Sequence, residues 1–137
     1  MEQTLATFPY AYTGLVTLAA VLMKFVFAWN VGQARRKHGV APPLTHGPDE
    51  FNRVLRVQSN TTEQMIIFLP VLWLVAVVNS DTVAASLGLV WVLARIWYAF
   101  GYLAGDGKRM PGFLINIVVS SILFVYAAWG LLAQVMG

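Results

Sequence analysis

Four long apolar stretches, separated by short segments rich in polar residues, glycine or proline, dominate this chain. An α-helix needs about 20 such residues to cross a hydrocarbon layer of about 30 Å, and each stretch is long enough. The segment at residues 38–47 contains glycines and paired prolines that forbid a continuous helix. The turn at residues 79–82 is so short that the helices on either side of it must be antiparallel neighbours. The pattern predicts spans at about residues 9–37, 49–78, 83–104 and 112–135.

Composition supports a membrane protein. Hydrophobic residues make up 58% of the 137 residues and charged residues 11%, with a mean hydropathy of +0.67. Soluble domains carry about 25% charged residues, so we expect an all-α integral membrane protein with one four-helix domain over residues 1–137. The N-terminus lacks the basic region of a signal peptide, so the first span should stay in the mature protein.

The same composition argues against two kinds of partner. Too little of the chain is soluble surface to carry a patch that tracks nucleic-acid phosphates. The chain has no cysteine, and His38 and His46 lie in one loop without a third ligand nearby, so no metal site is predicted.

The distribution of basic residues predicts the orientation. Four spans place the first and third loops on one side of the membrane, and these loops and their flanks hold seven of the nine lysines and arginines: Arg35, Arg36, Lys37, Arg53, Arg56, Lys108 and Arg109. The opposite side shows only Glu2 and Asp81. By the positive-inside rule, the basic side is cytoplasmic.

Several polar residues lie within the predicted spans. At 3.6 residues per turn, Arg53, Arg56, Asn60 and Glu63 fall on one stripe of the second span. In the third span, three residues at spacings of three and four share a face: Arg95, Tyr98 and Tyr102. Both sets occupy the cytoplasmic half of the bilayer. The pattern therefore predicts a polar pocket between helices that opens to the cytoplasm and suits an anionic or zwitterionic ligand.

Structural alternatives stay open for some of these residues. Arg53 can snorkel to the headgroups, and the two tyrosines can belong to an interfacial aromatic belt. Arg95 can simply lock helices together, and Lys24, at a depth like that of Glu63, can be the counter-ion of that carboxylate. A charge three turns deep costs several kcal/mol unless it is paired or functional, so Arg95 and Glu63 need a partner or a ligand.

Four segments make the chain resemble the MAPEG family, the membrane-associated proteins in eicosanoid and glutathione metabolism. They lie at residues 34–36, 41–48, 51–63 and 94–102. The most specific is the pattern Arg-x-Gln-x-Asn-x-x-Glu on the second span, formed by Arg56, Gln58, Asn60 and Glu63. The likeness is greatest to the microsomal glutathione transferase and leukotriene C synthase branches.

The resemblance implies a homotrimer of four-helix subunits that binds glutathione between neighbouring subunits near the cytoplasmic face. It implies that the following residues bind glutathione: Arg35, Arg56, Gln58, Asn60, Glu63, Tyr98 and Tyr102. Arg56 would hold a carboxylate with help from the amides, Glu63 would bind the ammonium, and the tyrosines would donate hydrogen bonds. Arg109 would be the catalytic residue that stabilises the thiolate. Lowering the thiol pKa from about 8.5 to about 6.5 takes roughly 2.7 kcal/mol, which a guanidinium in a partly desolvated pocket can supply.

The implied function is conjugation of glutathione, as co-substrate, to lipophilic electrophiles from the membrane lipid, with reduction of lipid hydroperoxides as a related activity. Gln64 stands where leukotriene C synthases carry a tyrosine, and the loop at residues 105–108 is less basic than in the family. One alternative is a non-catalytic member that binds lipid or a partner protein. Another is a four-span proton-coupled exporter, although such a protein should carry its carboxylate in the first span.

Overall fold

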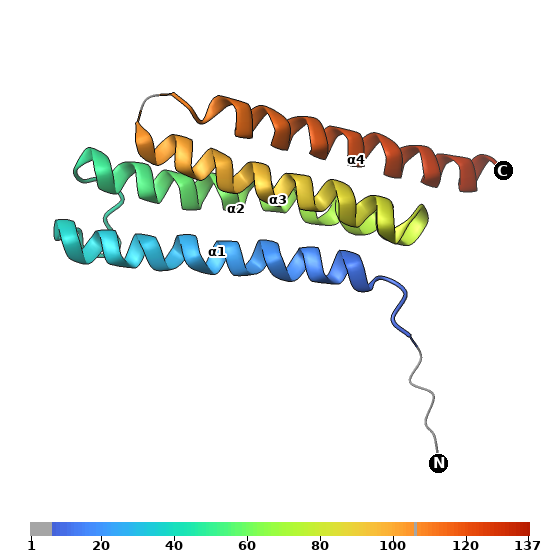
Figure 1. Ribbon diagram of the computed structural model, residues 1–137, viewed down its shortest axis with the longest axis horizontal. Coiled ribbons are helices and arrows are strands. Elements are labelled where there is room, and N and C mark those ends of the chain that lie inside the picture. The colour runs from blue at the N-terminus through green and yellow to red at the C-terminus, as the bar shows by residue number, and fades with distance from the viewer. Residues whose placement is uncertain (1–6, 106) are drawn as a thin grey trace, which may run out of the picture.

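The computed structural model describes residues 7–105 and 107–137. Within them the chain forms four antiparallel helices: α1 (Ala11–His38), α2 (Asp49–Val78), α3 (Asp81–Ala104) and α4 (Met110–Met136). All four are long and apolar enough to cross a membrane, and the described residues form no strand, so the predicted all-α membrane fold is confirmed. The start of α1 and the end of α4 lie at the same end of the molecule (Figure 1).

The helix ends depart slightly from the predicted bounds, for local reasons. Pro9 lies in a turn, with Tyr10 as the N-cap, so α1 begins two residues later than predicted. The third helix begins earlier, at Asp81, because the Ser80 hydroxyl accepts a hydrogen bond from the amide of Val83 at 3.3 Å. Such a cap satisfies one of the free amides in the first turn.

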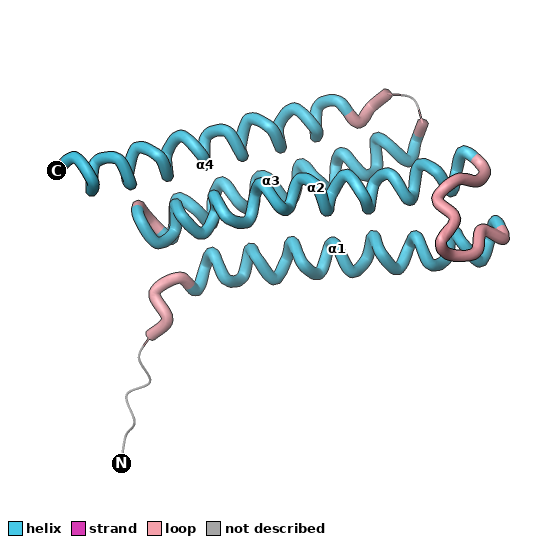
Figure 2. The backbone as a smooth tube through the Cα atoms, turned by 180° about the vertical axis from the view of Figure 1, so that it is seen from behind, coloured by secondary structure: helices cyan, strands magenta, loops and turns pink. Residues whose placement is uncertain are grey.

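The α2–α3 pair forms the centre of the molecule. Helices α1 and α4 lie on opposite sides of this pair and do not pack against each other within the described residues (Figures 1 and 2). Phe68 of α2 stacks on Trp91 of α3 with ring centroids 4.0 Å apart. At Gly88 of α3 an added Cβ would lie 2.8 Å from a Val16 methyl group and 2.9 Å from a Leu72 methyl group, so a larger residue would make these side chains shift.

Glycines also bring the start of α4 onto α3. A Cβ at Gly112 would lie 2.6 Å from the Ala94 carbonyl and 2.6 Å from the Tyr98 amide. A Cβ at Gly101 would lie 2.4 Å from the carbonyl of Lys108. Lys108 and the Arg109 backbone therefore lie tightly against α3, which fixes the position of Arg109.

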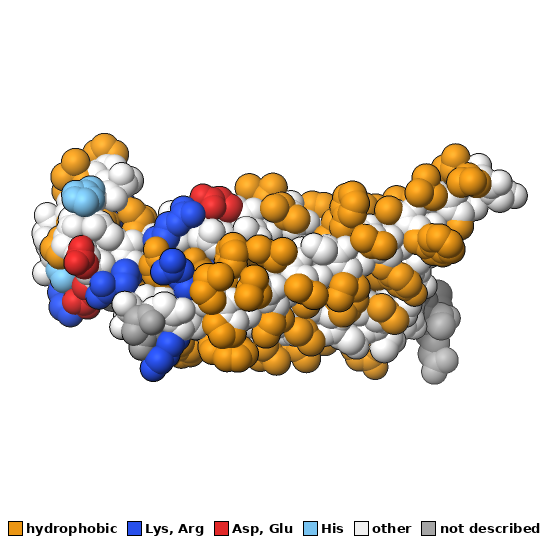
Figure 3. Space-filling view, turned by 90° about the horizontal axis from the view of Figure 1, so that it is seen from above, with side chains coloured by type: hydrophobic (Ala, Val, Ile, Leu, Met, Phe, Trp, Pro, Cys, Tyr) orange, Lys and Arg blue, Asp and Glu red, His pale blue; other side chains and the backbone are white. Residues whose placement is uncertain are grey.

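The two ends of the bundle differ in charge. Most Lys and Arg side chains gather toward one end, here called the basic end, which carries the α1–α2 and α3–α4 loops, and hydrophobic side chains cover the middle (Figure 3). At the opposite end the Asp81 carboxylate accepts hydrogen bonds from the Thr13 hydroxyl at 2.6 Å and the Thr13 amide at 2.9 Å. This contact ties the start of α3 to the start of α1.

Candidate functional site

A buried arginine lies at the centre of the candidate site. Arg95 is fully buried, and its guanidinium is shared among neutral acceptors. Its Nε donates to the Thr61 hydroxyl at 3.1 Å and its Nη1 to the Asn116 side-chain oxygen at 3.4 Å. Its Nη2 donates to the side-chain oxygen of Asn60. These bonds connect α2, α3 and α4, so the expectation that Arg95 links helices is met.

The acceptors of Arg95 are oriented by the backbone. The Thr61 hydroxyl donates to the carbonyl of Val57 at 2.7 Å, which leaves its lone pairs for Arg95. The Asn116 amide donates to the Trp91 carbonyl at 2.8 Å, which turns its oxygen toward the guanidinium. Sequence reasoning missed both acceptors. Each acceptor is a polar residue within an apolar helix, which is visible in the sequence. That Thr61 and Asn116 both face Arg95 depends on how the helices are rotated, which only the structure shows.

Aromatic rings connect Arg95 to the basic end. The Arg95 guanidinium lies 3.8 Å above the centroid of the Tyr98 ring, and this ring lies 5.6 Å from that of Tyr102. The Arg109 guanidinium lies 5.0 Å from the Tyr102 centroid. Stacking of this kind is favourable because the ring face carries negative charge. The series thus runs from a buried cation to an exposed one at the end of the bundle.

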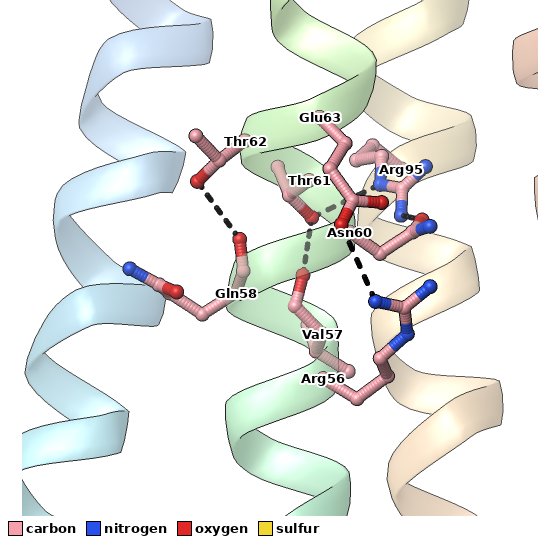
Figure 4. A network of polar contacts seen from close by, with 8 residues as sticks. All are labelled: Arg56, Val57, Gln58, Asn60, Thr61, Thr62, Glu63 and Arg95. Atoms are coloured by element: carbon pink, nitrogen blue, oxygen red, sulfur yellow. Dashed lines mark hydrogen bonds and ion pairs between the residues drawn. The ribbon is translucent and has the colours of Figure 1, made fainter. Parts of the chain in front are cut away.

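Arg56 and Glu63 lie beside this series. The Arg56 Nη1 is 3.4 Å from the Glu63 carboxylate, and their side chains are 50% and 57% exposed. Figure 4 shows both on the side of α2 that also carries Asn60 and faces Arg95. Among the described residues no carboxylate forms an ion pair with Arg95. The cluster therefore offers cations and one carboxylate to a ligand with charges of both signs.

The remaining predicted binding residues lie elsewhere in the chain. Gln58 points from α2 toward α1, away from Arg56 and Glu63 (Figure 4). Arg35 holds the α1–α2 loop: its Nη1 donates to the carbonyl of Leu44 at 2.7 Å. One chain thus brings together six of the predicted residues, Arg56, Asn60, Glu63, Tyr98, Tyr102 and Arg109, and leaves Gln58 and Arg35 on the α1 side.

Two other cations, Arg53 and Lys24, lie apart from the cluster. The Arg53 guanidinium lies against the end of α3, with its carbon 3.6 Å from where a Cβ of Gly105 would be, and a cation is favourable at a helix C-terminus. Lys24 is half-buried and forms no ion pair within the described residues. The alternative in which Lys24 pairs with Glu63 is thus not formed inside one chain, where Glu63 contacts Arg56.

Apolar grooves lie next to the polar cluster. A groove of about 420 Å³ between α2 and α4 is lined by Gln64, the neighbour of Glu63, and by Ile67 and Phe124. A larger groove of about 710 Å³ runs along α4 past Ile117 and Trp129. Acyl or aromatic groups of a lipophilic molecule fit such surfaces. Among the described residues no group of three His, Asp or Glu side chains is placed to hold a metal ion.

The chain is similar to known membrane proteins along most of its length. The MAPEG family profile matches residues 13–129. The chain is 49% identical to an uncharacterised protein of Synechocystis sp. over 123 residues, which cover 90% of both chains. It is 37% identical to microsomal glutathione S-transferase 2 of Mus musculus over 119 residues, 87% of this chain and 81% of the relative. It is 39% identical to leukotriene C4 synthase of Cavia porcellus over 124 residues, 90% of this chain and 83% of the relative.

Proposed function

The chain belongs to the MAPEG family of multi-pass membrane proteins, and on that premise we propose that it is a glutathione transferase. Two of its relatives are named for a glutathione transferase and a leukotriene C4 synthase, which supports a membrane enzyme that uses glutathione. The proposal of transferase activity rests on one observation: the series Arg95, Tyr98, Tyr102 and Arg109 lies beside the Arg56–Glu63 pair. It offers groups of both charges at the edge of an apolar surface.

The ligand-binding roles follow from charge. Glutathione carries two carboxylates, an ammonium and a thiol. Arg56 is half exposed and can bind a carboxylate through two parallel hydrogen bonds. The Glu63 carboxylate is the one acid among the described residues of the cluster, and it binds the ammonium. Tyr98 and Tyr102 lie between the Arg56–Glu63 pair and Arg109, and their hydroxyl groups donate hydrogen bonds to the ligand.

Arg109 then acts on the thiol. A guanidinium near the sulfur favours the ionised form, so the thiol releases its proton to solvent and the sulfur becomes nucleophilic. The thiolate forms a bond to the electrophilic carbon of an acceptor in the apolar groove, and the displaced electron pair moves to the leaving group or to the oxygen of an opened ring. With a lipid hydroperoxide, two glutathiones become the disulfide, and the peroxide becomes an alcohol and water.

A second copy of the chain completes this site. Arg56 and Glu63 are about half exposed inside a predicted span, and lipid is a costly neighbour for charges. Arg35 and Gln58, which the family resemblance also assigns to glutathione, lie on the α1 side of the same chain. A ring of copies in which the α1 side of one meets the site of the next, such as a homotrimer, joins both sets. The basic end faces the cytoplasm, where glutathione enters.

The test of this proposal is the ultraviolet absorbance of the thiolate. The purified protein with glutathione at neutral pH should show thiolate absorbance and conjugate a lipophilic electrophile. Arg109→Gln should lose most of both: if the thiol pKa returns from about 6.5 to about 8.5, the thiolate fraction at pH 7 falls from about 76% to about 3%, so conjugation should slow about 25-fold. Lys37→Gln is the matched control, because Lys37 pairs with Glu50 in the loop region, away from the cluster. Equal thiolate absorbance in Arg109→Gln would remove Arg109 from the mechanism, and glutathione binding without turnover would favour the non-catalytic alternative.

A further inference from the structure

Lys24 is a charged residue that the proposed reaction does not use. It lies in the apolar middle of α1, is half-buried, and forms no ion pair within the described residues. A lysine at the centre of a membrane helix costs about 2.5–3.5 kcal/mol when lipid surrounds it. Such a residue is stabilised by an anionic partner, and no carboxylate within the described residues provides one.

The depth of Lys24 matches that of Glu63. Lys24 lies 14 residues before the end of α1 at His38. Glu63 lies 14 residues after the start of α2 at Asp49. Both helix ends lie at the basic end, and at 1.5 Å per residue both side chains are about 21 Å from it. Equal depth lets the two charges meet across a boundary between parallel-oriented copies.

The two side chains lie on different faces of one chain. Lys24 and Arg35 are 11 residues apart, which is close to three helical turns, so they share one face of α1. Gln58 points from α2 toward α1 (Figure 4). Glu63 lies with Arg56 on the opposite side of α2 and is 57% exposed. Two different faces that complement each other in charge form a head-to-tail contact, which can close into a ring.

The surface beside Lys24 has room for a neighbouring chain. A hollow of about 290 Å³ on α1 is lined by Phe25, Ala28, Trp29 and Gly32, among others. A Cβ added at Gly32 would meet nothing within 4 Å, so the fold of the chain itself does not require glycine there. Small residues at this position allow close approach of another membrane helix.

We propose that Lys24 of one copy forms an ion pair with Glu63 of the next copy, at the membrane-facing side of the candidate site. The pair gives Lys24 an anionic partner and covers only part of the exposed Glu63 carboxylate, whose two oxygens can accept hydrogen bonds from Lys24 and from the ligand ammonium at once. The ion pair would fix how far α1 of one copy is shifted along α2 of the next. The proposal concerns assembly and does not depend on transferase activity.

Cross-linking tests it directly, because the natural chain has no cysteine and gives no background. The double variant Lys24→Cys, Glu63→Cys is treated in membranes with a short bismaleimide, since a Lys–Glu contact spans more than a disulfide can. Covalent dimers and trimers should replace the monomer band in a denaturing gel. Each single variant should stay monomeric, and so should the control Leu22→Cys, Glu63→Cys, because Leu22 points away from the Lys24 face and is 64% exposed.

The opposite results overturn the proposal. These are a monomer band that persists in the double variant, or equal cross-linking in the control. A second measurement needs no cysteine variant. Lys24→Met should lower the temperature at which the oligomer dissociates in detergent, whereas Lys24→Arg, which keeps the charge, should dissociate at nearly the same temperature as the natural chain. If Lys24→Met dissociates like the natural chain, the ion pair is absent. Conjugation of glutathione is measured separately, so its failure would count against the proposed function only.

Discussion

At the scale of single residues, the site depends on a buried cation whose partners are all neutral. Arg95 has hydrogen bonds to Thr61, Asn60 and Asn116 and contacts the Tyr98 ring, but it has no carboxylate partner within the described residues. A carboxylate there would cancel the charge of the guanidinium. Neutral acceptors hold the guanidinium in place and preserve its positive potential, which favours an anionic ligand nearby.

Removal of one acceptor should be costly. Thr61→Val keeps the shape of the side chain but leaves the buried Arg95 Nε without its acceptor, so we expect a loss of about 1–3 kcal/mol in the free energy of unfolding. Thr62→Val is the matched control, because the exposed Thr62 hydroxyl bonds only to the Gln58 carbonyl of the same helix. Denaturation in detergent compares the two. Equal stability of both variants would show that the hydrogen bonds of Arg95 contribute little to the free energy of unfolding.

Glu63 should determine the affinity for the ammonium of glutathione. Replacement by Gln removes one charge-assisted hydrogen bond, so the dissociation constant should rise about 10- to 100-fold. The natural protein should also bind a glutathione analogue that lacks the amino group more weakly than glutathione. Glu63→Gln should bind the two compounds nearly equally. Continued strong discrimination by Glu63→Gln would mean that another group recognises the ammonium.

At the scale of elements, the apolar stretches determine the four helices, and the stripe on α2 identifies Arg56, Asn60 and Glu63. Two features needed the structure. The rotation of α2 separates Gln58 from its neighbours in the motif, and the packing of α4 brings Asn116 to Arg95. Sequence periodicity gives faces within one helix, whereas the rotation and register between helices come from side-chain packing. Residue 106, in the loop whose register matters for Arg109, lies outside the described residues.

The close approach of α4 to α3 should be sensitive to one methyl group. In Gly112→Ala the new Cβ would lie 2.6 Å from the Ala94 carbonyl oxygen, so α4 must shift and move Arg109. We expect a loss of about 1–3 kcal/mol in stability together with slower conjugation. Gly14→Ala is the control, because its Cβ would meet only Phe8 at 3.8 Å. An unaffected Gly112→Ala variant would contradict the tight packing of α4.

At the scale of the whole molecule, the chain has two polar faces at similar depth. One carries the cluster from Arg56 to Arg109. The other is on the α1 side, with Lys24 and Arg35 on α1 and Gln58 pointing toward α1. On the proposed function each face carries only part of the glutathione site, and lipid is a costly neighbour for the charges of both. The account therefore predicts that the working site exists only where two copies meet.

Subunit complementation tests this claim most directly. Gln58→Glu should abolish conjugation by repelling a glutathione carboxylate, and Arg109→Gln should abolish it by leaving the thiol protonated. When the two variants are co-expressed in equal amounts, about a quarter of the boundaries join an intact Arg109 to an intact Gln58. We predict that the mixed oligomers regain about a quarter of the natural activity. Mixed oligomers as inactive as their parents would contradict the account, because both residues would then have to act within one chain.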